Sequence, residues 1–466
     1  MSRAPIPYLA MIPSEIWLAC WSLCSARQLR RLSLSVDTHD LMRGPDWSAN
    51  IHRLHRAAVR LERIADGPRV RMVRSWTFAT NGNLASLSSS YSHITDIGMV
   101  VAMYERVVTA FSSTLGRYQH LCSLNIREFL IDKPFRDTLV SLPMLEEVTL
   151  GNCDIPARDG ALLNLKFFSM SNTGRKRTKD FSEESLELVS PGRLQTLKID
   201  GCGDTVPLMV GFGGQRFSHL TQLSVDNIFD LDLFLRFLTQ CPRLQCLSAG
   251  KFSRDGLTSL SSHVHPETMP FLRSIDAPLG LVRALTPNRP VRDVTVQPGY
   301  SLSAEDFTLA VLDISNASVP VRSLTLPSIY PTLESLNSMS SLFPGLTSLS
   351  MEIRSQEQPS PVVHVAWEMH PKLPDSVRLH EVLSWICSGL VSLPAEIEVL
   401  RFPIRNYVSK STELSVEHQH QVVAALSRMY PSLRELEMGY HNNPHWVRNG
   451  ALWKRKGVNS YIQVHR

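Results

Sequence analysis

Apolar residues recur along the chain with a mixed spacing of three and two. The clearest copy runs from Leu194 through Leu197 and Ile199 to Cys202, with polar residues between them. An offset of three is typical of a tight turn, and an offset of two places side chains on the same face of a strand. One short unit of this kind cannot bury its own apolar face. The pattern therefore predicts a unit that is stable only when it stacks on further copies.

Further copies alternate with stretches of helical spacing along most of the chain. The first plausible copy lies at residues 73–78. The later copies begin at Leu121, Leu145, Leu165, Leu194, Leu220, Leu244, Leu272, Val291, Val321, Leu346, Ile397 and Leu433. Proline precedes several of them, as at Pro242, Pro344 and Pro431, where it would end a helix and direct the chain into the next strand. Alternating strands and helices predict parallel strands.

Most copies begin about 20 to 29 residues after the previous one, which is the period of leucine-rich repeats. Residues 73–440 resemble an irregular array of such repeats. The predicted fold class is α/β, a curved leucine-rich-repeat solenoid with its parallel strands on the concave face, because helices are wider than strands. An irregular insertion is expected between Arg354 and Pro374, and residues 441–466 are expected to form a C-terminal tail.

The region before the array shows helical spacing. Apolar residues from Ile16 to Val36 predict a pair of short amphipathic helices within a segment that spans residues 8–46. A linking amphipathic helix is predicted within residues 47–72, with an apolar face and a basic face. Its arginines are Arg53, Arg56, Arg60 and Arg63. The basic face could contact an acidic partner or could simply be solvated.

The stretch from Ile12 to Trp17, IPSEIW, is followed by Leu23 and by LRRLSLSV at residues 29–36. This order resembles the F-box motif at the start of many fungal F-box proteins. After Val36 the sequence departs from the pattern of the third F-box helix. An F-box segment before leucine-rich repeats is similar to the substrate-recognition subunits of cullin-type ubiquitin ligases. An alternative is that residues 12–36 only cap the first repeat.

The resemblance implies a Skp-family adaptor as one partner and an unknown protein substrate as the other. The apolar residues implied to bind the adaptor are Ile12, Pro13, Ile16, Trp17, Leu23, Leu29 and Leu32. The alternative function is a leucine-rich-repeat scaffold that no longer binds the adaptor. Neither function requires a cofactor or catalysis.

Residues between the buried positions of each strand should point to the concave surface. They form a hydroxyl-rich, modestly acidic face that suits a partner with basic or hydrogen-bonding groups, although a solvated strand surface would look similar. The charged residues predicted to bind the partner are Glu147, Lys198, Asp200, Asp226, Asp276, Asp293, Glu352 and Glu435.

Charge balance, cysteine content and apolar runs limit the classes of function that the chain could have. The 466 residues include 48 Lys and Arg against 43 Asp and Glu, and this small excess does not indicate nucleic-acid binding. Eight scattered cysteines without a C-x-x-C pair indicate reduced thiols in the cytoplasm or nucleus. Cys153 and Cys202 occupy the ninth position of their copies, where packing is expected. No apolar run is long enough to predict a membrane span.

Motifs for catalysis or metal binding are not found. The sequence contains no G-x-S-x-G elbow and no P-loop, and its histidines lack the spacing of a zinc-protease helix. We therefore expect no enzyme activity and no metal site. A basic loop at residues 174–179 is read either as a nuclear import signal or as an ordinary exposed loop.

Overall fold

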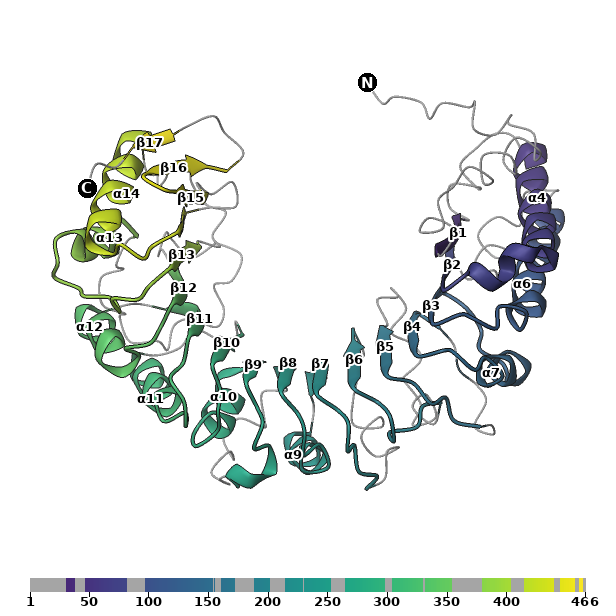
Figure 1. Cartoon of the computed structure of the whole chain (residues 1–466), viewed down its shortest axis with the longest axis horizontal. Helices are drawn as coiled ribbons and strands as arrows, with labels where there is room; N and C mark the ends of the chain where they lie inside the picture. The colour runs from purple at the N-terminus through teal and green to yellow at the C-terminus, as the bar shows by residue number, and fades with distance from the viewer. Residues whose placement is uncertain are drawn as a thin grey trace, which may run out of the picture. The chain divides into compact units, whose positions relative to one another are not determined.

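The computed structural model divides the chain into two compact units, Met1–Asn227 (unit 1) and Ile228–Arg466 (unit 2). The structure describes residues 31–37, 47–81, 97–153, 155, 161–171, 188–201, 214–228, 230–252, 265–297, 304–329, 332–353, 379–403, 415–439, 445–456 and 461–463. In each unit the strands follow the inner, concave side of a bend and the helices lie on its outer side (Figure 1).

Unit 1 contains one ladder of parallel strands. Its strands pair in chain order, and they are β1 (Arg31–Asp37), β2 (Ser75–Asn81), β3 (Ser123–Arg127), β4 (Glu147–Gly151), β5 (Phe167–Ser171), β6 (Thr196–Asp200) and β7 (Gln222–Ile228). The helical elements described between them are α4 (Trp47–Asp66), the 3-10 helix η2 (Pro68–Met72), α6 (Ile97–Leu115) and α7 (Lys133–Val140).

Unit 2 repeats this plan. Its parallel strands are β8 (Cys246–Phe252), β9 (Ser274–Ala277), β10 (Asp293–Val296), β11 (Ser323–Ile329), β12 (Ser348–Ile353), β13 (Val399–Pro403) and β14 (Glu435–Gly439). Its helical elements are α9 (Leu231–Thr239), the 3-10 helix η5 (Pro266–Thr268), α10 (Leu279–Leu285), α11 (Ala304–Ser315), α12 (Leu333–Leu342), α13 (Leu379–Cys387) and α14 (Val416–Met429).

The core consists of the apolar positions that define the sequence pattern. Leu194, Leu197 and Ile199 are at most 3% exposed, and the equivalent residues of the other copies are buried in the same way. Burying a leucine or isoleucine side chain stabilises a fold by about 1.5 to 3 kcal/mol. The stacked apolar positions therefore hold the ladder together, and the predicted fold class is confirmed.

The eighth position of several copies turns the chain out of its strand. Glu128, Asn152 and Gly201 all have a positive φ there, between 52° and 66°. The N–H groups of Glu128 and Asn152 donate to the carbonyls of Gly151 and Ser171 at 2.7 Å, so each turn extends the ladder by one hydrogen bond. Glycine adopts this conformation without steric cost, which explains why Gly201 suits this turn.

The helix predicted over the end of the N-terminal segment is wrong at residues 31–37. These residues form β1, which pairs in parallel with β2 so that Leu32 lies opposite Trp76. The alternation of leucine, serine and valine from Leu32 to Val36 has the period of a strand, and the helical interpretation overlooked it. The ladder consequently includes residues well before 73. The six other residues that the resemblance implies for adaptor binding, from Ile12 to Leu29, lie outside the described residues.

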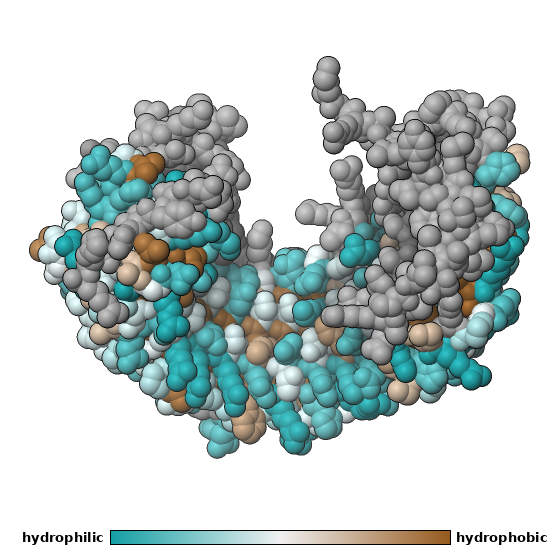
Figure 2. Space-filling view, turned by 45° about the horizontal axis from the view of Figure 1, so that its top comes forward, coloured by the Kyte–Doolittle hydropathy of each residue, from teal (hydrophilic) through white to brown (hydrophobic). Residues whose placement is uncertain are grey.

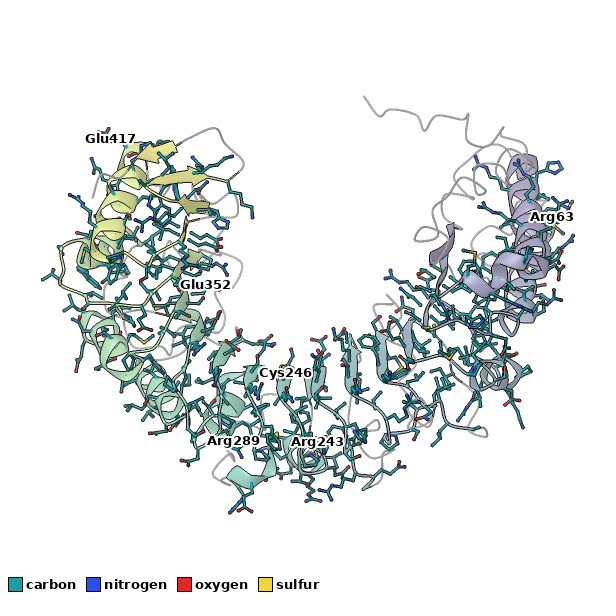
Figure 3. All side chains as sticks on the ribbon, in the orientation of Figure 1. Arg63, Arg243, Cys246, Arg289, Glu352 and Glu417 are labelled. Atoms are coloured by element: carbon teal, nitrogen blue, oxygen red, sulfur yellow. The ribbon has the colours of Figure 1, made fainter. Side chains whose placement is uncertain are left out.

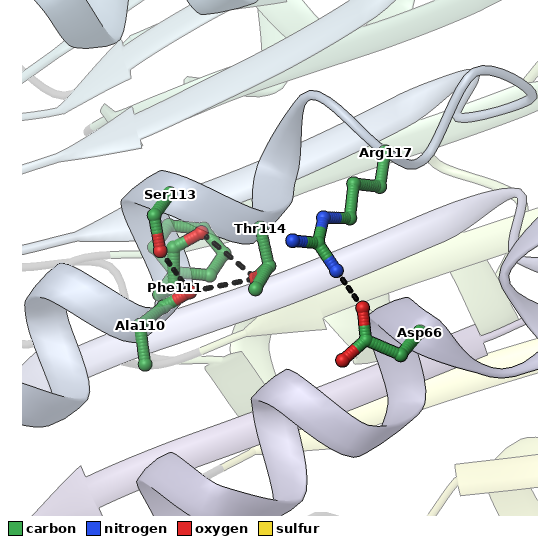
Figure 4. Close-up of polar contacts among 6 residues, drawn as sticks. All are labelled: Asp66, Ala110, Phe111, Ser113, Thr114 and Arg117. Carbon is green, nitrogen blue, oxygen red and sulfur yellow. Dashed lines mark hydrogen bonds and ion pairs between the residues drawn. The ribbon is translucent and has the colours of Figure 1, made fainter.

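The amphipathic helix predicted within residues 47–72 is confirmed as α4. Leu54, Ala58 and Leu61 are buried on the face that packs against α6. Because α4 joins β1 to β2, it is the helix of a repeat and not a linker. At its end, Asp66 forms an ion pair with Arg117, just beyond α6 (Figure 4).

The hydroxyl of Thr114, near the end of α6, donates to the carbonyl of Ala110 at 2.7 Å and is buried (Figure 4). This bond to the preceding turn satisfies a polar group that would otherwise be costly to bury.

Residues after 440 form an antiparallel cap in place of the expected tail. Strands β15 (His445–Asn449), β16 (Leu452–Arg455) and β17 (Tyr461–Gln463) continue the sheet from β14. Trp446 and Trp453 are completely buried, and the indole Nε1 of Trp453 donates to Ser427 Oγ of α14 at 3.2 Å. The cap covers the last parallel strand, as repeat arrays require. The insertion expected at residues 354–374 lies outside the described residues.

Candidate protein-interaction surfaces

The side chains between the buried positions form rows across each ladder. In unit 1 the first row includes Glu147 opposite Phe167, and the second includes Thr149 opposite Ser169. Neighbouring strands are about 4.8 Å apart, so side chains in a row lie next to one another. We call these rows the unit 1 strand face and, in the second unit, the unit 2 strand face.

Two aspartates form the acidic end of the unit 1 strand face. Asp200 is the last residue of β6 and Asp226 lies within β7, and both are exposed. Partial burial raises the pKa of the Asp200 carboxyl, the charge of Asp226 raises this pKa further, and Lys198 opposes the shift. The backbone N–H of Gly201 donates to Asp226 Oδ2 at 3.1 Å. This hydrogen bond holds the two negative charges together on a rigid ladder.

The other charged residues predicted on this face have separate surroundings. Glu147 is exposed at the start of β4. Lys198 Nζ lies 5.8 Å from the centre of the Phe167 ring, within range of a cation–π contact. The unit 1 strand face therefore combines a lysine and an aromatic ring with the aspartate pair.

The unit 2 strand face carries acidic residues among hydroxyl groups. Asp293 is exposed between Ser274 and Ser323 in register. Asp276 is half-buried and accepts a hydrogen bond from Ser248 Oγ at 3.5 Å. The carboxylate of Asp293 is accessible to a hydrogen-bond donor, and binding of a basic partner at this face stays a prediction.

Ion pairs occupy the far end of the unit 2 strand face. Arg401 Nη2 lies 3.0 Å from Glu435 Oε2, and Arg401 Nε lies 3.8 Å from Glu437. His445 Nε2 of the cap lies 3.6 Å from Glu435 Oε2. Glu435 is thus a member of an ion-pair cluster, which leaves it less able to attract a partner than Asp293.

One predicted surface residue is buried. Glu352, near the end of β12, is only 7% exposed, so its placement on an open surface was wrong (Figure 3). Alternation along a strand sets the face on which a side chain lies, but it does not determine how much other chain covers that face.

The sequence interpretation also missed a cysteine on the unit 2 strand face. Cys246 is exposed in β8 and pairs in register with Ser274 (Figure 3). Burial raises the pKa of its thiol, and the charge of Asp293 raises it further, against a lowering effect of Arg273. The offset of two residues from Leu244 would have located Cys246 on this face.

Metal-ligating residues do not cluster in the described part of the chain. No group of three or more His, Cys, Asp or Glu side chains there could hold a metal ion. Cys153 Sγ contacts the carbonyl oxygens of Gly151 and Ile126 at 3.5 and 3.6 Å, which confirms its predicted packing at the ninth position. Cys202 lies outside the described residues.

Among the described helices, none combines the length and apolar character needed to cross a membrane.

Comparison with known proteins gives structural similarities only. No family model and no curated protein matches the chain. A crystallised protein of Bacteroides fragilis is 11% identical with a TM-score of 0.32, covering 65% of this chain and 71% of that protein. A leucine-rich-repeat protein of Leptospira interrogans is 10% identical with a TM-score of 0.27, covering 70% of this chain and 92% of that protein.

An internalin of Listeria monocytogenes is 13% identical with a TM-score of 0.28, covering 65% of this chain and 91% of that protein. Scores this low carry no argument about function. The register of the ladders and the repeated buried positions are what define this chain as an α/β leucine-rich-repeat solenoid.

Proposed function

We propose that this chain is a non-catalytic interaction protein that holds a protein partner on its strand faces. The observation that carries this proposal is the presentation of exposed acidic side chains, such as Asp226 and Asp293, on rigid parallel ladders. Because the backbone of a ladder is already ordered, little backbone conformational entropy is lost when a partner binds. The negative charge of these side chains favours a partner surface with lysine, arginine or other hydrogen-bond donors.

In its finer form, the proposal makes the chain the substrate-recognition subunit of a cullin-type ubiquitin ligase in the cytoplasm or nucleus. The N-terminal segment would dock a Skp-family adaptor, while the repeats hold the protein substrate. Ile16 and Trp17 would act as apolar anchors in a groove of the adaptor. The support for this form is the F-box resemblance of residues 12–36.

A scaffold that does not bind the adaptor is the second candidate. The strand β1 favours it, because Leu32 belongs to the repeat ladder and not to a docking helix. Both candidates use the strand faces in the same way, and they differ only in the role of the N-terminal segment.

Adaptor binding separates the two candidates. The full chain would be tested in a pull-down with purified Skp-family adaptor, alongside Ile16→Asp with Trp17→Ala. The ligase form predicts binding that this double variant abolishes, while Glu417→Gln, an exposed substitution on α14, leaves it unchanged. No binding by the unmodified chain would reject the ligase form and retain the scaffold.

The strand faces are tested by charge reversal. The full chain with Asp226→Lys, Asp276→Lys and Asp293→Lys would be compared with the unmodified chain by cross-linking in cells and identification of the captured proteins. We expect the captured set to lose its main members. Asp232→Lys with Glu334→Lys, which reverses two charges at exposed positions of helices α9 and α12, is the control. Unchanged capture by the triple variant would place partner binding elsewhere.

A further inference from the structure

Helix α4 of unit 1 carries a row of arginines that the strand-face function does not use. Arg53, Arg56, Arg60 and Arg63 follow one another at intervals of three and four residues, and all are exposed. Such spacing places them on one face of a helix, opposite the face buried against α6. We call this row the arginine stripe. It extends over about 15 Å, at about 1.5 Å per residue.

Positive charge is concentrated around this stripe. Residues 47–81 contain seven arginines, no lysine and two acidic residues, so this segment has an excess of five, equal to the net charge of +5 of the whole chain. The remaining residues are therefore balanced. One of the two acidic residues, Asp66, already forms an ion pair with Arg117. In Figure 2 the coloured residues at the right-hand margin, where α4 and α6 lie, are mostly hydrophilic.

Arginine in place of lysine indicates the chemistry of the partner. The planar guanidinium group donates two parallel hydrogen bonds to one carboxylate, which lysine cannot do. A stripe of about 15 Å matches about five residues of an extended chain, at about 3.3 Å per residue. A short acidic segment could therefore pair several carboxylates with the stripe at once. Figure 3 shows Arg63 on α4, at the outer side of unit 1.

Other anionic partners fit the surface less well. An amphipathic helix enters a membrane surface through its apolar face, but Leu54, Ala58 and Leu61 are buried within the protein. Single-stranded nucleic acid usually stacks on exposed aromatic rings, and Trp76 in β2, within this segment, is only 2% exposed. The balanced charge of the remaining chain would add no attraction for a phosphate backbone.

We propose that the arginine stripe of α4 binds an acidic segment, rich in Asp and Glu, of a partner protein. This surface is separate from the strand faces, and its use does not depend on the F-box resemblance. The binding should weaken as salt is raised, because exposed charge pairs are screened.

The test uses the full chain and a labelled peptide of about ten residues with alternating Glu and Asp, long enough to cover the stripe. Arg53→Glu with Arg63→Glu should weaken binding by about tenfold or more, since like charges then face each other. Arg53→Lys with Arg63→Lys should give a smaller loss, because it keeps the charge but not the paired hydrogen bonds. Arg243→Glu with Arg322→Glu, two exposed arginines of unit 2, should change nothing.

Circular dichroism of each variant shows whether it is folded. If the glutamate variant were unfolded, the lysine variant and the salt dependence would decide. The proposal is overturned if the acidic peptide does not bind at millimolar concentration or binds the glutamate variant equally well. It is also overturned if a single-stranded RNA or a phosphatidylserine vesicle binds the stripe more tightly than the peptide does.

Discussion

The carboxylate of Asp226 accepts a hydrogen bond from the backbone N–H of Gly201, with 3.1 Å between Oδ2 and N. Gly201 is the turn residue that follows Asp200 and has a φ of 66°. The turn that ends β6 is therefore hydrogen-bonded to a side chain of the next strand, β7. This arrangement holds Asp200 close to Asp226, and it explains why the charge of Asp226 raises the pKa of Asp200.

Replacing Asp200 with asparagine should stabilise unit 1 near neutral pH. Burial and Asp226 raise the pKa of Asp200 above the usual value of 3.8, so the folded state binds the proton more tightly than the unfolded state. Stability then falls as the pH rises from 3.8 through the folded-state pKa. Because the site is exposed, we expect Asp200→Asn to raise the free energy of unfolding by less than about 1 kcal/mol.

Urea unfolding across a pH series would measure this effect. The gain should be largest at neutral pH and should disappear as the pH approaches 3.8. Asp137→Asn, an exposed substitution on α7, serves as the control. An equal gain at neutral and acidic pH would show that the charge of Asp200 is not the cause.

The Cys246 thiol should react slowly for an exposed cysteine. Its pKa is raised, mainly by partial burial of the thiol and then by Asp293, so less of the reactive thiolate is present at neutral pH. We expect Asp293→Asn to speed alkylation of Cys246 by about two- to fivefold and Arg273→Gln to slow it, as the signs of their charges require. Mass spectrometry of iodoacetamide-treated protein would measure both rates, and identical rates in all three proteins would contradict the prediction.

Arg289 should be a structural residue of unit 2. It is 1% exposed, and its guanidinium donates to the carbonyls of His265 at 2.8 Å and Leu285 at 3.1 Å (Figure 3). Arg289→Met keeps the apolar stem but leaves the carbonyls of His265 and Leu285 without these donors. We expect a loss of about 2 to 4 kcal/mol in the free energy of unfolding, measured with urea. The exposed control Arg292→Met should lose less than about 0.5 kcal/mol, and equal losses would show that burial of Arg289 is unimportant.

The C-terminal cap should stabilise the last repeat. Trp453→Ala removes a fully buried indole and its hydrogen bond to Ser427, so we expect a loss of about 3 to 5 kcal/mol. Hydrogen exchange should also speed up at the amides of β14, because this strand would lose its cover. Leu452→Ala, at a side chain that is 43% exposed, is the control. Unchanged exchange in β14 would show that the last repeat is stable without the cap.

The candidate surfaces show which features a local sequence pattern can predict and which it cannot. The offsets that located Asp200, Asp226 and Asp293 on exposed strand faces follow from the alternation of side chains along a strand. The same offsets predicted that Glu352 is exposed, although it is buried, and they could not show that Arg401 forms an ion pair with Glu435. Burial and ion pairing depend on segments distant in sequence, which an offset does not contain.

The sequence by itself determined the repeat unit, the buried positions such as Leu194 and Leu197, and helix α4, because spacing along one segment dictates which side chains share a face. Only the tertiary structure decided that residues 31–37 join the ladder as β1 and that residues after 440 form a cap. Short apolar stretches fit more than one element in isolation, and the neighbouring strand whose hydrogen bonds they complete selects the one that forms.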